Sequence, residues 1–117
     1  MKRVASEILQ NEMLVGGESV IKFEQEFAKY IGTDYAVSTN SGSSALLLAF
    51  NAINTKNQDK VVTPSATFIA TINGACLLGA KPVFCEIGHD YVISPEQLEL
   101  TLNRNEVKCA IPVHLYG

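Results

Sequence analysis

Residues 41–45 have the side chains best suited to chemistry in this sequence. They read Ser-Gly-Ser-Ser-Ala and stand where a polar turn passes into strong helix formers at residues 45–50. The free N–H groups and the macrodipole at a helix N-terminus bind phosphate well. Gly42 would let the backbone approach an anion, and Ser43 and Ser44 would add hydroxyl donors. The same serines would also serve as simple helix caps, so the pattern leaves a phosphate site and a plain cap both open.

The segment matches no common nucleotide-binding or hydrolase motif. The chain contains no Walker pattern and no Gly-x-Gly-x-x-Gly pattern. Ala45 stands where a nucleophile elbow requires its second glycine. The chemistry suggested by residues 41–45 is therefore anion binding and not nucleophilic attack.

Other candidates lie near the ends of predicted strands. Phe68 follows a predicted strand, at the edge where open α/β folds bind ligands. Its ring would either stack on a flat cofactor or pack in the core. His114 and His89 have no companion Cys, His or carboxylate at metal-ligand spacing, and Asp34 and Glu86 are isolated acids. The pattern predicts no metal site and no acid/base pair.

Length and composition set the class of protein. The 117 residues suit one modest domain. With 47% hydrophobic and 18% charged residues, the chain can build a core and is not typical of disorder. The net charge of −3, without a basic cluster, argues against a nucleic-acid partner. No apolar run reaches the length of a membrane span. The first residues, Met-Lys-Arg, are followed by mixed polar residues and not by the apolar core of a signal peptide, so we expect a cytoplasmic protein with no membrane partner. Three cysteines without Cys-x-x-Cys spacing predict buried, reduced thiols: Cys76, Cys85 and Cys109.

These candidates must be positioned by alternating helices and strands. Glycines predict the ends of two helices at Gly32 and Gly79. Ser94, Pro95 and Gln97 predict a helix start with a capping box. The apolar patterns predict helices at residues 3–13, 20–31, 45–50, 68–78 and from 95 on, and strands at residues 35–38, 60–63, 81–87 and 107–113.

This order predicts an α/β fold with a mostly parallel sheet flanked by helices. The last predicted strand has no helix after it to cover its face. We therefore expect residues 1–117 to be a single partial domain that is cut short at its C-terminus.

Several segments together resemble one known family. The chain is similar to the N-terminal part of the large domain of sugar aminotransferases of the DegT/DnrJ/EryC1/StrS type, which are fold-type I enzymes that use pyridoxal 5′-phosphate (PLP). The similar segments follow the family's order and spacing over nearly the whole chain: residues 23–32, 41–46, 63–71, 79–84 and 112–117.

The resemblance implies roles for individual residues. In the family, Ser-Gly-Thr-x-Ala-Leu cradles the PLP phosphate; by position, Gly42 and Ser43 match its glycine and threonine, and Ser44 would offer its backbone N–H. An aromatic residue after Thr stacks on the pyridine ring, and Phe68 takes this position. Gly16-Gly17 match, more loosely, a Gly-Gly segment near the family's active site and dimer interface.

The resemblance also implies what is missing. The family's Schiff-base lysine and the aspartate that pairs with the pyridine nitrogen lie beyond the position where this chain stops. No lysine of the chain has the context of the family's lysine motif. We therefore expect this chain to contain no catalytic residue and to be inactive on its own.

The expected function is thus the N-terminal part of a PLP-dependent aminotransferase for nucleotide-linked keto-sugars, with glutamate as the expected amino donor. One alternative is a non-catalytic remnant that oligomerises and binds phosphate-bearing ligands. Another is a relative that carries out PLP-dependent sugar dehydration. We expect a homo-oligomer, in keeping with the family, and consider a second polypeptide that supplies the missing C-terminal part.

Overall fold

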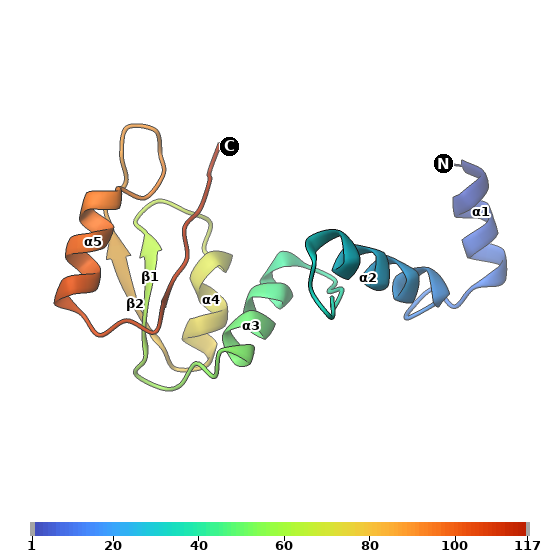
Figure 1. Cartoon of the computed structure of the whole chain (residues 1–117), viewed down its shortest axis with the longest axis horizontal. Helices are drawn as coiled ribbons and strands as arrows, with labels where there is room; N and C mark the ends of the chain where they lie inside the picture. Colours follow the sequence, from blue (N-terminus) through green and yellow to red (C-terminus); the bar gives the residue numbers. More distant parts are fainter. Residues whose placement is uncertain (1, 117) are drawn as a thin grey trace. The chain divides into compact units, whose positions relative to one another are not determined.

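The computed structural model describes residues 2–116, which form two compact units that divide between Thr39 and Asn40. The first contains α1 (Lys2–Asn11) and α2 (Glu18–Ile31). The second contains α3 (Gly42–Ala52), β1 (Lys60–Pro64), α4 (Ala70–Leu77), β2 (Lys81–Cys85), α5 (Pro95–Arg104) and β3 (Cys109–Ala110) (Figure 1).

The second unit is built on a parallel sheet with the strand order β2-β1-β3. Val62 of the central strand lies opposite Val83 on one side and Ala110 on the other. The predicted α/β fold with a parallel sheet is confirmed. The strand predicted at residues 107–113 is much shorter in the structure, where β3 has only Cys109–Ala110, followed by one further bond from the Ile111 N–H to the Val62 carbonyl.

Helices cover both faces of this sheet, and Figure 1 shows α5 and α4 on opposite sides of β1 and β2. The buried core lies on the face toward α3 and α4, where Phe50, Val61, Ile72 and Ala75 pack together. On the other face, α5 approaches β2 where the Thr101 hydroxyl contacts the Cys85 sulfur at 3.9 Å. The central strand β1 is buried from Val61 to Pro64, as expected for a parallel strand that is covered on both faces, whereas the edge strand β2 is mostly exposed.

Local signals end and begin the helices as predicted. Gly32 and Gly79 adopt φ angles of +82° and +83°, in the left-handed region that glycine tolerates without a Cβ clash. Ser94 caps α5 because its hydroxyl accepts a hydrogen bond from the Gln97 N–H at 3.3 Å. The reciprocal half of the predicted capping box is not made, since the Ser94 N–H donates to the Glu86 carbonyl at 3.0 Å.

The prediction of a strand at residues 35–38 is wrong. These residues belong to no strand, and none of the described residues forms a ladder with them. The segment is instead tied to α2, because Glu24 Oε1 accepts hydrogen bonds from the N–H and the hydroxyl of Ser38, both at 2.7 Å. β-propensity alone does not create a strand, because strand backbone groups need a neighbouring strand to bond.

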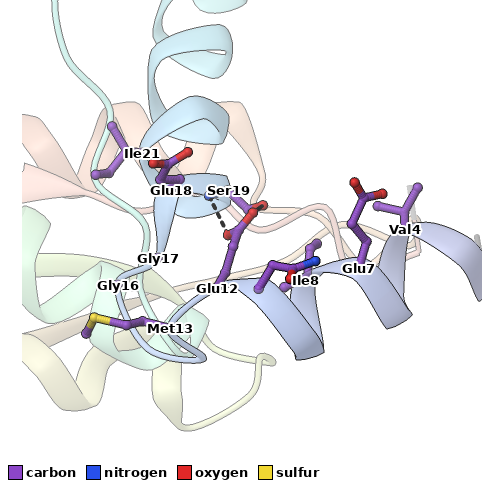
Figure 2. A pocket seen from close by; sticks show the side chains of 11 residues that line it. Val4, Glu7, Ile8, Glu12, Met13, Gly16, Gly17, Glu18, Ser19 and Ile21 are labelled. Carbon is purple, nitrogen blue, oxygen red and sulfur yellow. Dashed lines mark hydrogen bonds between the residues drawn. The ribbon is translucent and has the colours of Figure 1, made fainter.

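The turn between α1 and α2 depends on the predicted Gly-Gly segment. Gly16 has a φ of +68°, and a Cβ on Gly17 would collide with the carbonyl oxygen of Met13. Across this turn, Glu12 accepts hydrogen bonds from the N–H and the hydroxyl of Ser19 at 2.9 Å each (Figure 2). The Glu12 carboxylate thus satisfies a free N–H group at the start of α2.

The prediction of three buried thiols holds only in part. Cys85 is buried and Cys109 is half-buried, but Cys76 is exposed on α4, so the prediction is wrong for Cys76. The apolar neighbours of Cys76 in sequence alternate between the two sides of a short helix, and Leu77 is itself 77% exposed. Among residues 2–116, no helix has the length and apolar character needed to cross a membrane.

Candidate functional site

Two segments that are far apart in sequence meet at one surface cavity in the second unit. The cavity has a volume of about 390 Å³. The first turns of α3 supply one wall, and the segment that leads into α4 supplies the other. The lining residues are Gly42, Ser43, Leu46, Phe68, Ala70 and Thr71. Three of the four predicted binding residues therefore share this cavity, and Ser44 does not line it.

The N-terminus of α3 presents two backbone donors. Ser41 is the N-cap, and its hydroxyl accepts a hydrogen bond from the Ser44 N–H at 3.2 Å. The Ala45 N–H bonds to the Ser41 carbonyl at 3.1 Å. Within residues 2–116, no acceptor bonds the N–H groups of Gly42 and Ser43. With the helix dipole, these two donors favour a negative charge at this end of α3.

Ser44 is held by the N-cap of α3 and does not face the cavity. Its hydroxyl is 2.8 Å from Asn40 Oδ1 and 3.0 Å from the Ser41 hydroxyl. Its N–H, which the resemblance assigns to the phosphate, is bonded to Ser41. The plain-cap alternative thus describes Ser41 and Ser44, whereas Gly42 and Ser43 are the members of the turn that line the cavity.

Phe68 is exposed and lies before the first residue of α4. Its side chain is 72% exposed, so the alternative of a core phenylalanine on a helix is wrong. The Thr67 and Thr71 hydroxyls on either side of it lie 2.9 Å apart and join the segment to the first turn of α4. The cavity therefore combines a flat apolar surface, the Phe68 ring, with two N–H groups that can bind an anion, those of Gly42 and Ser43.

The charge around this cavity differs from that of a larger one. A cavity of about 610 Å³ lies between α1 and the start of α2 in the first unit (Figure 2). Its lining includes the carboxylates of Glu7, Glu12 and Glu18. Hydrogen bonds from the N–H and hydroxyl of Ser19 hold the pKa of Glu12 below its usual value, so Glu12 stays ionised at neutral pH. Three carboxylates repel a phosphate, whereas no acid lines the cavity of Ser43 and Phe68.

The other candidates of the second unit do not line this cavity. His89 and His114 are both exposed, and neither they nor Glu86 are among its lining residues. Among the described residues, no three His, Cys, Asp or Glu side chains are grouped so that they could hold a metal ion. Three lining residues were not predicted from the sequence: Leu46, Ala70 and Thr71. Leu46 follows Gly42 by four positions and therefore lies on the same face of α3.

Comparison with known proteins decides the family. The model of the DegT/DnrJ/EryC1/StrS aminotransferase family matches residues 1–117. The chain belongs to the DegT/DnrJ/EryC1/StrS aminotransferase family. It is 34% identical to the UDP-2-acetamido-2-deoxy-3-oxo-D-glucuronate aminotransferase of Pseudomonas aeruginosa, over 94% of this chain and 31% of that protein.

Solved structures of the family share this fold. DesV from S. venezuelae is 34% identical, with a TM-score of 0.84 over 99% of this chain and 31% of that chain. The E. coli GDP-4-keto-6-deoxy-D-mannose-3-dehydratase with bound hydrated PLP is 28% identical, with a TM-score of 0.76 over 85% of this chain and 27% of that chain. This DegT-family chain therefore spans about 30% of the length of the relatives that it matches.

Proposed function

We propose that this chain supplies the cofactor-binding part of a PLP-dependent aminotransferase that acts on nucleotide-linked keto-sugars, with glutamate as the amino donor. Membership of the family supports an aminotransferase. The Pseudomonas aeruginosa relative is named for a UDP-linked keto-sugar acid, which supports the substrate class. The proposal treats residues 1–117 as a partial domain.

The observation that carries the proposal is the shared cavity of Gly42, Ser43 and Phe68. PLP has a phosphate and a flat pyridine ring, and the donors present fit both parts. The N–H groups of Gly42 and Ser43 and the Ser43 hydroxyl suit the phosphate, and the exposed Phe68 ring suits one face of the pyridine. A Cβ on Gly42 would meet no protein atom within 4 Å, so the space beside this backbone is open.

The chain's own residues would bind and orient the group. When bound, PLP supplies an electron sink for the bonds that an aminotransferase breaks. Gly42 and Ser43 would hold the phosphate by charge-assisted hydrogen bonds, and Phe68 would limit tilting of the ring. None of the residues that line the cavity is a lysine. We therefore propose that the 117-residue chain binds PLP weakly and does not transaminate.

Two alternatives have support of their own. The dehydratase neighbours, at 28% identity, favour PLP-dependent sugar dehydration as the second candidate reaction. The exposed apolar side chains favour a partner that covers them, either a second copy of the chain or a polypeptide that supplies the remaining length. Phe84, on the edge strand β2, is 64% exposed, and Leu77 on α4 is 77% exposed.

The test is a pair of variants that add one charge to the same helix turn. Ser43→Glu adds a carboxylate to the lining of the cavity, and Ala45→Glu adds it to an exposed position outside the lining. We expect S43E to abolish binding of PLP and of inorganic phosphate in equilibrium titrations, whereas A45E retains both. If S43E also retains binding, Ser43 is only part of a helix end and the proposed site is wrong.

The predicted inactivity has a separate measurement. The pure chain is incubated with PLP and reduced with borohydride, and labelled residues are located by mass spectrometry. We expect no single lysine to be labelled stoichiometrically and no turnover of glutamate with a keto-sugar. One fully labelled lysine together with turnover would show that the chain carries its own catalytic lysine.

A further inference from the structure

Gly74 lies in the middle of α4, where α4 comes close to α3. It is buried, and a Cβ built on it would lie 3.0 Å from Leu47 Cα, 3.1 Å from Leu47 N and 3.1 Å from Phe50 Cδ2. Carbon atoms in contact ordinarily lie about 3.5–4.0 Å apart. Two of these three neighbours are backbone atoms, which cannot move without moving α3 itself.

Glycine is otherwise a poor choice at this position. It disfavours a helix interior, because it loses more backbone freedom on folding than alanine does. The backbone of α4 at this position is ordinary helix, with no positive φ to explain a glycine. The close approach of α3 is therefore the feature of the structure that favours a glycine here.

The contact at Gly74 continues directly into the cavity. On α4, Gly74 follows Thr71 by three positions and Ala70 by four, so the three residues share one face. On α3, Leu47 follows Ser43 by four positions and shares its face in the same way. The two helices are thus in close contact at Gly74 and Leu47. The cavity lies one helical turn nearer to the N-terminus of each helix, between Ser43 of α3 and Phe68, which precedes α4.

We infer that Gly74 is a positioning residue: it sets the separation of α3 and α4 so that the N–H groups of Gly42 and Ser43 and the ring of Phe68 reach one ligand together. The inference rests on the proposed function, because it assumes that one ligand uses both walls. A methyl group at residue 74 moves the walls apart by a few tenths of an ångström. A ligand that binds both walls then loses its contacts with one of them, whereas a ligand that binds only the N-terminus of α3 keeps all of its contacts.

The test compares two ligands on Gly74→Ala. Inorganic phosphate needs only the N-terminus of α3, and PLP needs both walls. We expect G74A to weaken PLP binding about tenfold, the order of effect that a misplacement below 1 Å produces in a preorganised site, with phosphate affinity unchanged within about twofold. Equal affinity of G74A and the parent chain for PLP overturns the inference.

Two control variants separate positioning from stability. Asn73→Ala changes an exposed neighbour on α4, and Val83→Ala removes methyl groups from the sheet face toward α5, away from the contact between α3 and α4. We expect both to keep the parent ratio of PLP to phosphate affinity. V83A and G74A are compared where they lower the melting temperature by the same amount. If V83A then lowers PLP affinity as much as G74A does, the loss of affinity comes from lower stability of the whole unit, and the inference is wrong.

A second readout needs no ligand. In ¹H–¹⁵N spectra of the full chain, G74A should shift the amide resonances of Gly42, Ser43 and Phe68, and N73A should leave them in place. Unchanged resonances in G74A overturn the inference whatever the binding data show. If the parent chain binds neither phosphate nor PLP, the proposed function fails, while the spectra still decide whether Gly74 positions the two walls.

Discussion

Replacing Phe68 by alanine should weaken PLP binding while leaving most of the stability of the chain intact. The Phe68 ring is 72% exposed, so little more than a quarter of its surface touches other residues. A fully enclosed aromatic side chain buries roughly 150–250 Å², so the covered part of Phe68 is about 60 Å². At about 25 cal/mol per Å², its packing contributes about 1.5 kcal/mol at most to the free energy of unfolding.

The matched control is Phe50→Ala, which removes the same side chain from the core. Phe50 is 3% exposed and packs against Val61, Ile72 and Ala75. Its loss should lower the free energy of unfolding by about 3–5 kcal/mol. Urea unfolding followed by circular dichroism separates the two variants, because the expected losses differ by at least a factor of two.

Ligand binding is the second half of this prediction. Stacking of two aromatic rings is worth about 0.5–1.5 kcal/mol, so F68A should raise the Kd for PLP about two- to tenfold. The Kd for inorganic phosphate should not change, because phosphate uses the N-terminus of α3. Equal destabilisation of F68A and F50A would show Phe68 to be a core residue. A parallel loss of PLP and phosphate affinity would show that no stacking occurs.

Two further predictions concern pH and thiol chemistry. Hydrogen bonds from the N–H and the hydroxyl of Ser38 hold the pKa of Glu24 below its usual value of 4.5. These two hydrogen bonds therefore stabilise the chain fully above pH 4.5, and their contribution is lost as the pH falls through the lowered pKa of Glu24. An NMR titration of the Ser38 amide should show a midpoint below 4.5, and Glu24→Gln should abolish this transition. Burial raises the pKa of the Cys109 thiol above 9.0, so iodoacetamide at about pH 8 should alkylate exposed Cys76 first; equal rates for Cys76 and Cys109 in the native chain would contradict the burial of Cys109.

Signals that act over a few residues were predicted well from the sequence. Gly32 and Gly79 end helices because a left-handed residue closes the last turn, and Ser94 begins one because its hydroxyl reaches a nearby N–H. Each of these needs only the chain within four residues. The failed strand at residues 35–38 shows the opposite case, because its backbone pairing depends on a second segment.

The candidate site follows the same division. The helix start at Gly42 and Ser43 and the position of Phe68 after β1 were visible in the pattern, since parallel strands place such segments at one edge of the sheet. That Ser41 uses the N–H of Ser44 depends on the rotamer of one hydroxyl. The importance of Gly74 was not visible at all, because a close approach involves a second helix whose path the residues around Gly74 do not encode.

The central place of β1 in the sheet has a consequence for synthesis on the ribosome. β1 is made before both of its neighbours, since β2 and β3 follow it in the chain. A nascent chain can close one side of β1 once β2 has emerged, but the other side stays bare until residue 109 is available. During that interval the strand that is most buried in the finished unit exposes its unpaired N–H and C=O groups, so the chain is most open to association with other polypeptides late in its translation.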